Sequence, residues 1–169
     1  MLPEKLAAAR ALLEDVTPLQ MDCGAVCGGA CCVSHPGDET GMLLFPGEEA
    51  AYQGDASYAV TDSPMGKLLT CSGQCDRRNR PLACRMFPLV MLLRDDGVKV
   101  ATDAAARSVC PLARQGKNAL SQEFVAAVRQ AAQILAEDET QREHLRRLTS
   151  QQDEWKALQT QYGRRNEHV

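Results

Sequence analysis

The sequence predicts a small, cysteine-rich α+β domain, and three observations in its 169 residues lead to this prediction. Apolar residues repeat at helical spacing near both ends of the chain. Short apolar runs separated by turn residues fill the middle, and such runs are typical of strands. All eight cysteines lie between Cys23 and Cys110. We therefore expect short strands with a hairpin, an N-terminal helix and a C-terminal helical pair.

The N-terminal helix is predicted from residue 3 to about residue 16. Pro3 suits its first turn, and Pro18 ends it. Its apolar face follows steps of four and three: Leu2, Leu6, Ala9, Leu13 and Val16. Charged residues interrupt this stretch, so it does not resemble a signal peptide, and no run nears the ~18 apolar residues of a membrane span. We expect a cytoplasmic protein without a membrane partner.

The middle of the chain combines short strands with turns. Asp95-Asp96-Gly97 between two apolar runs is a good hairpin signal. Pro46-Gly47 is expected to form a turn, with a helix opening towards residue 52, and residues 54–64 are expected to form a loop. The predicted strands are residues 42–45, 68–71, 89–93 and 98–101, the second of which ends at Cys71.

Two helices are predicted after the last cysteine. The first carries the apolar stripe Leu120, Phe124, Val128, Ala131 and Leu135. Thr140 followed by Glu143 is a capping box that starts the second helix, and Gly163 is expected to end it. Its stripe is Leu145, Leu148, Trp155, Leu158 and Tyr162. The helical spacing of Trp155 and Tyr162 favours packing in the core or between helices.

Four of the eight cysteines fall within ten residues, among three glycines. Eight in 169 is too few for a small disulfide scaffold, and in a reducing cytosol such an array indicates metal or redox chemistry. Disulfides, or burial of the thiols as small apolar groups, are the alternatives. Thiolates bind zinc or a 4Fe–4S cluster in sets of four, so eight suffice for two sets. The candidate metal ligands are Cys23, Cys27, Cys31, Cys32, Cys71, Cys75, Cys84 and Cys110.

The first cysteine stretch is expected to be a turn-rich loop with at most one helical turn, because each glycine costs up to ~1 kcal/mol in a helix. His35 follows this stretch, and we expect it to be a surface histidine. Neighbouring side chains usually point in different directions, so Cys31 and Cys32 are predicted to join different metals.

Arginines gather around Cys84, although the whole chain has a net charge of −3. Their charge can balance that of metal-bound thiolates. Phe87 is the nearby aromatic residue, and without a base-stacking platform we do not expect nucleic acid as a partner.

Two of these arginines are predicted to support a bound cofactor. Arg80 and Arg85 flank the Pro-Leu-Ala-Cys sequence, so we expect them to lie beside the metal and to donate to sulfur. Arg77 and Arg78 are expected to be solvated in a polar turn.

Residues 23–32 read Cys-Gly-Ala-Val-Cys-Gly-Gly-Ala-Cys-Cys, residues 43–48 read Leu-Leu-Phe-Pro-Gly-Glu, and residues 80–88 read Arg-Pro-Leu-Ala-Cys-Arg-Met-Phe-Pro. With Cys71 and Cys75, these segments resemble the CxxCxxCC family of zinc- or iron-chelating domains, which includes flagellin lysine N-methylases. The resemblance covers about residues 22–112. It implies that the cysteines of these segments are metal ligands, with Cys110 matching a later cysteine. The first two gaps here are three residues rather than two.

Two functions remain open. In the first, residues 1–112 form a metal-organised domain with a binding or redox role, and residues 113–169 form a helical arm packed on it through which a protein partner could bind. Few long apolar runs occur in residues 20–112, so the metal is expected to supply much of the stability. The alternative, implied by the resemblance, is an S-adenosylmethionine-dependent protein-lysine N-methyltransferase that uses an iron–sulfur cluster. No glycine-rich loop for that cofactor follows a predicted strand, and no catalytic residue is assigned.

Overall fold

The computed structural model describes residues 1–32, 41–73 and 76–165. Within them the chain forms helices and two small antiparallel sheets, which confirms the predicted α+β class. The helices are α1 (Glu4–Leu12), α2 (Gly24–Cys27), α3 (Leu82–Met86), α4 (Pro111–Gln115), α5 (Gln122–Leu135) and α6 (Glu139–Arg165). The strands are β1 (Met42–Leu43), β2 (Tyr58–Ser63), β3 (Gly66–Cys71), β4 (Leu89–Arg94) and β5 (Gly97–Thr102). The 3-10 turns are Ala30–Cys32, Glu48–Ala51, Arg77–Asn79, Ala105–Ser108 and Lys117–Ala119.

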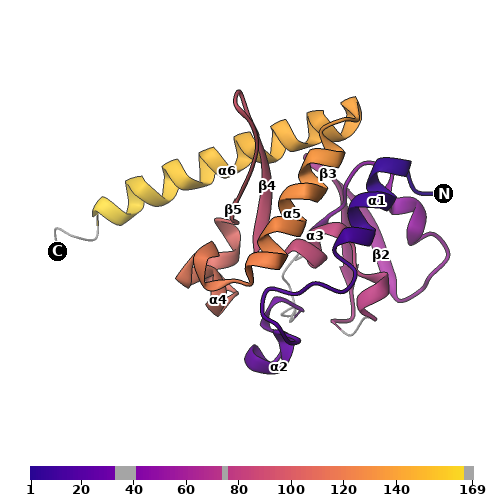
Figure 1. The fold of residues 1–169 in the computed structure, drawn as a ribbon, viewed down its shortest axis with the longest axis horizontal. Helices are drawn as coiled ribbons and strands as arrows, with labels where there is room; N and C mark the ends of the chain where they lie inside the picture. The colour runs from indigo at the N-terminus through magenta and orange to yellow at the C-terminus, as the bar shows by residue number, and fades with distance from the viewer. Residues whose placement is uncertain (33–40, 74–75, 166–169) are drawn as a thin grey trace.

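One hydrophobic core joins α1, α5, the β4–β5 hairpin and the first half of α6 (Figure 1). Leu6, Leu13, Phe124 and Leu135 are completely buried in it. Burying one such side chain contributes about 1.5–3 kcal/mol. The core takes side chains from both sides of residue 112, and α5 lies inside it.

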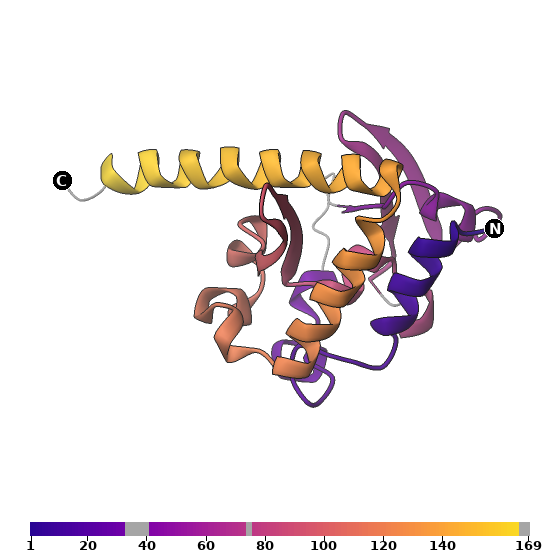
Figure 2. The same cartoon turned by 45° about the horizontal axis from the view of Figure 1, so that its top comes forward.

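The predicted N-terminal helix is confirmed, but α1 ends at Leu12, before the predicted end. The carbonyl groups of Glu14 and Val16 accept hydrogen bonds from the Arg77 side chain instead of continuing a helix. The helix therefore ends early, and the chain reaches the cysteine segment through a non-helical link (Figure 2).

The β4–β5 hairpin confirms the prediction made from Asp-Asp-Gly, with Arg94 paired to Gly97 next to the turn. In the other sheet β3 is central, between β1 and β2. The expectation of a loop at residues 54–64 is wrong, because β2 lies there. This edge strand is largely exposed, so it lacks the apolar alternation that would have revealed it. The helix expected towards residue 52 is only a short 3-10 turn.

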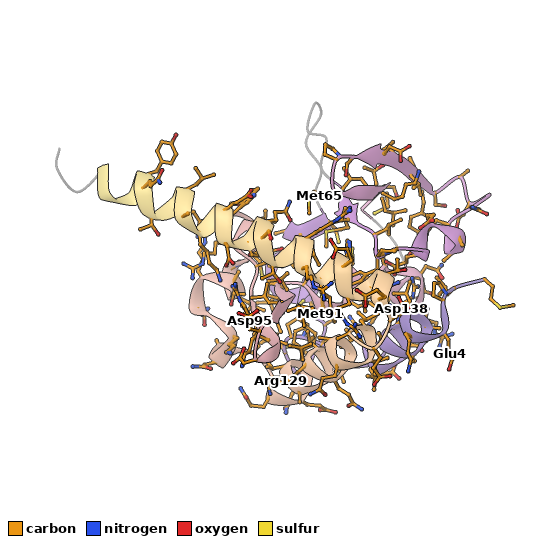
Figure 3. The ribbon with its side chains drawn as sticks, turned by 90° about the horizontal axis from the view of Figure 1, so that it is seen from above. Glu4, Met65, Met91, Asp95, Arg129 and Asp138 are labelled. Atoms are coloured by element: carbon orange, nitrogen blue, oxygen red, sulfur yellow. The ribbon has the colours of Figure 1, made fainter. Side chains whose placement is uncertain are left out.

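Helix α6 begins slightly before the predicted capping box. The Asp138 carboxylate accepts a hydrogen bond from the Gln141 backbone N–H at 2.9 Å, and Asp138 lies at the N-terminal end of the helix (Figure 3). Gly163 does not end the helix, which continues to Arg165. No helix in the described part of the chain combines the length and apolarity needed to cross a membrane.

The second half of α6 extends beyond the body of the molecule (Figure 2). Two hydrogen bonds to Ala104 connect this part of the helix to the body. Gln152 accepts one from the Ala104 N–H at 2.9 Å, and Gln159 donates the other to the Ala104 carbonyl at 3.3 Å. Trp155 and Tyr162 are 44% and 63% exposed. The expectation that they pack in the core or between helices is therefore wrong, because α6 extends past the end of the core.

Candidate metal centre

Residues 22–32, called the thiol segment below, lie on the side of the molecule away from α6 (Figure 1). The segment consists of the single turn of α2 and a 3-10 turn, joined by Gly28 and Gly29 at positive φ. This confirms the expected turn-rich loop. Neither turn contains a buried residue. The hydrogen bonds found in the described thiol segment stay within it, as in Cys32 N–H to Gly29 carbonyl at 2.7 Å.

Cys31 and Cys32 lie side by side in the 3-10 turn, with their Sγ atoms 4.0 Å apart. The expectation that they point in different directions is wrong, because this tight turn places both sulfurs together. Two thiolates on one tetrahedral zinc ion, with bonds of ~2.3 Å, are about 3.8 Å apart. The observed separation therefore matches two ligands of one metal ion. Their predicted division between two metals stays a prediction.

In the Cys31–Cys32 pair, the electrostatic environment favours the thiolate form of Cys32. Hydrogen bonding between the two thiols lowers the pKa of Cys32 to about 6 and raises that of Cys31. The positive charge of Arg80 lowers the pKa of Cys32 further. A thiolate is the form that binds metal, so Cys32 is prepared to act as a ligand near neutral pH.

Three further cysteines belong to the same neighbourhood. Burial raises the pKa of Cys23, and so does the negative charge of Cys27 and Cys110, while Arg80 opposes this effect. Cys31 in turn is affected by the charges of Cys23 and Cys27. Cys110 is buried just before α4, far along the chain. Five thiols from two distant segments therefore lie within electrostatic range of one another or of Arg80.

The other predicted ligands are Cys71, Cys75 and Cys84, and they are not shown to lie near the five thiols described above. Cys84 lies on α3, where its negative charge adds slightly to the raised pKa of Tyr52, and Cys71 is exposed at the end of β3. Cys75 and His35 lie outside the described residues. The seven cysteines that are described are all free thiols.

The donor chemistry suits a thiophilic metal, but the described part of the chain does not form a finished coordination shell. Within it, no three Cys, His, Asp or Glu side chains are placed to hold a metal ion. The close pair Cys31 and Cys32 is the nearest approach to ligand geometry. A metal would therefore have to draw further thiols inwards.

The arginines divide differently from the prediction. Arg85 is buried and donates to the carbonyls of Arg80 at 2.9 Å, Arg10 at 3.0 Å and Arg78 at 2.5 Å, while its donation to sulfur stays a prediction. Arg77 is half-buried and clamps the link after α1, whereas Arg78 is exposed as expected. Arg80 is the arginine whose charge acts on the thiols.

A buried ion pair that the sequence reasoning missed holds this arginine-rich stretch. Glu48 is completely buried and accepts from Arg10 Nη1 at 2.6 Å and from the Leu82 backbone N–H at 2.7 Å. Tyr52 donates to the Asn79 carbonyl at 2.9 Å, and burial raises its pKa to about 12. The network therefore fixes the turn that carries Arg80. Glu48 was visible only as an acidic residue after Pro-Gly.

A hollow with a volume of about 580 Å³ has no cysteine in its wall. It is lined by Phe45, Lys67, Met65 and the start of α6. A smaller hollow of about 380 Å³ borders Asp22, next to the first cysteine, and is walled by Asp15 and other residues of the link. The larger hollow thus gives no support to chemistry at a thiol-bound metal.

No protein-family model matches the chain, and neither a curated protein nor a solved structure is significantly similar to it. The resemblance to the CxxCxxCC family therefore stays a prediction.

Proposed function

We propose that this protein binds zinc or an iron–sulfur cluster through the thiol segment and Cys110. The observation that carries the proposal is the Cys31–Cys32 pair, whose Sγ atoms lie 4.0 Å apart, with Cys23, Cys27 and Cys110 within electrostatic range of one another or of this pair. Free thiols fit a reducing compartment, which we propose to be the cytosol.

The energetics of the thiol segment support this proposal. Its α2 and 3-10 turns contain no fully buried side chain, so hydrophobic burial contributes little to holding it in one conformation. Bringing several thiolates together also costs free energy through repulsion between like charges. A bound metal offsets both costs, because it neutralises the thiolates and links distant parts of the chain. Cys71, Cys75 and Cys84 are the candidates to complete the ligand set.

The proposal is tested by metal analysis and a visible spectrum of protein purified without oxygen. We expect stoichiometric zinc, or iron and sulfide with thiolate-to-iron charge-transfer absorption. The single substitutions Cys23→Ser and Cys110→Ser should each lower the metal content, because we propose that both residues bind the same metal. Metal-free wild-type protein that does not take up zinc or iron under reducing conditions would contradict the proposal.

The role of the metal is proposed as binding or redox chemistry. The methyltransferase alternative has no observation of its own within the described residues, and it stays a prediction.

A further inference from the structure

The backbone of Gly73 touches the backbone of Cys32. Gly73 follows β3, and its φ is +81°. A Cβ atom added to it would lie 2.5 Å from the carbonyl oxygen of Cys32 and 3.6 Å from the carbonyl carbon. Side chains do not approach a carbonyl oxygen this closely, so the contact can form only when residue 73 is glycine.

This contact is important because few others anchor the thiol segment. The hydrogen bonds found in its described residues are internal, and its two turns bury no side chain. The chain meets β3 again at Gly41, where an added Cβ would lie 3.0 Å from the Leu69 carbonyl oxygen. Gly41 thus lies against β3, and Cys32 lies against the residue two positions after the end of β3.

We propose that Gly73 is a positioning residue for the metal centre. Its close approach fixes the Cys32 carbonyl against the end of β3, and the Cys31–Cys32 pair is thereby held where the other thiols can share its metal. A side chain at position 73 would push Cys32 outwards and move its sulfur with it. This inference rests on the proposed function.

Gly54 provides a matched control. Its φ is also +81°, but an added Cβ at Gly54 would meet no atom within 4 Å. Gly73→Ala and Gly54→Ala therefore impose the same kind of backbone strain, and only the first disturbs Cys32.

The experiment measures the affinity of metal-free wild-type, Gly73→Ala and Gly54→Ala proteins for Zn²⁺ by chelator competition. Co²⁺ spectra report the number of thiolate ligands. We expect Gly73→Ala to bind Zn²⁺ ~10–100-fold more weakly, the range found when residues that orient ligands are removed, and to show weaker thiolate–cobalt absorption. Gly54→Ala should bind like the wild type, while both variants lose similar stability in their metal-free melting curves.

Equal affinities of the two alanine variants, whether both unchanged or both weakened, would overturn the role of Gly73. If Gly73→Ala does not fold, Gly73→Asn and Gly54→Asn replace the pair, because asparagine tolerates positive φ better than alanine. A wild-type protein that binds neither Zn²⁺ nor Co²⁺ would overturn the proposed function and this inference with it. Tight binding by both the wild type and Gly73→Ala would remove only the inference.

Discussion

The helical core and the thiol segment differ in what holds them in place. Leu6, Leu13 and Phe124 are completely buried where α1 meets α5, and such burial contributes about 25 cal/mol per Å² of apolar surface. The two turns of the thiol segment bury no residue, and its hydrogen bonds are local within the described chain. The core can therefore order itself, while the segment needs an external tie, for which we propose the metal.

The largest expected effect comes from removing the metal. The core should keep its helices, while residues 22–32 lose their order and the melting temperature falls. A site saturated at ~1,000 times its Kd adds about 4.1 kcal/mol of stability, which is lost with the metal. Hydrogen exchange on verified metal-free, reduced protein should show protected amides in α5 and fast exchange in the thiol segment.

Two outcomes would contradict this difference between the helical core and the thiol segment. Loss of protection throughout α5 would mean that the core itself depends on metal. An unchanged melting curve would mean that no metal contributes to the folded state.

The next largest effect is expected at Glu48, on the core side of the comparison. Glu48→Gln leaves the buried Arg10 guanidinium without its partner charge, and breaking a buried pair in this way costs about 3–5 kcal/mol. Glu49→Gln is the matched control, because Glu49 is only half-buried and no ion pair is found for it among the described residues. Urea unfolding of both variants measures the difference, and equal midpoints would show that the ion pair adds nothing.

The two regions also differ in how far the sequence could predict them. Phe124, Val128 and Leu135 lie on one buried face of α5. Because the 3.6-residue period is local information, this helix was predictable, although it begins at Gln122, after Leu120. The same period identified the stripe of Trp155, but periodicity cannot show whether another element covers that stripe. In this chain the core ends before Trp155.

The candidate site was predictable in composition but not in arrangement. The clustered cysteines indicated thiol chemistry, yet the proximity of Cys110 to Cys23 depends on how α4 packs in three dimensions. The tie between Arg10 and Glu48 likewise joins residues 38 positions apart, and no local pattern encodes such a pairing. The 3-10 turn that brings Cys31 beside Cys32 reversed an expectation based on ideal geometry.

Acid is expected to lower the free energy of unfolding by a smaller amount. This effect comes from a buried histidine of the helical core and not from the thiol segment. His144 is 5% exposed, and burial, aided by the charge of Arg147, lowers its pKa from 6.5 to about 4. Between these values the unfolded chain binds a proton that the folded chain does not, so stability falls as pH falls. The loss should be about 2 kcal/mol between pH 7 and pH 5.

Urea unfolding of the metal-free protein as a function of pH measures this loss. His144→Phe removes the titrating group and keeps a ring against Phe45, whose centroid lies 4.8 Å from that of His144. The variant should lose this part of the pH dependence. An identical slope in both proteins would assign the acid sensitivity to other groups.

The smallest expected effect concerns Arg80, through which the core acts on the thiol segment. Its charge lowers the pKa of Cys23 and Cys32, so it favours the thiolates that bind metal. Arg80→Ala should weaken Zn²⁺ binding about tenfold, the low end for groups that support metal ligands, with little change in the melting of the metal-free protein. Arg78→Ala is the control, because its side chain is exposed and its carbonyl, which accepts from Arg85, is retained. The carbonyl of Arg80 also survives substitution and keeps its bond to Arg85, so the turn should stay in place. Equal affinities in the two variants would mean that the thiol segment binds metal without help from the arginine turn.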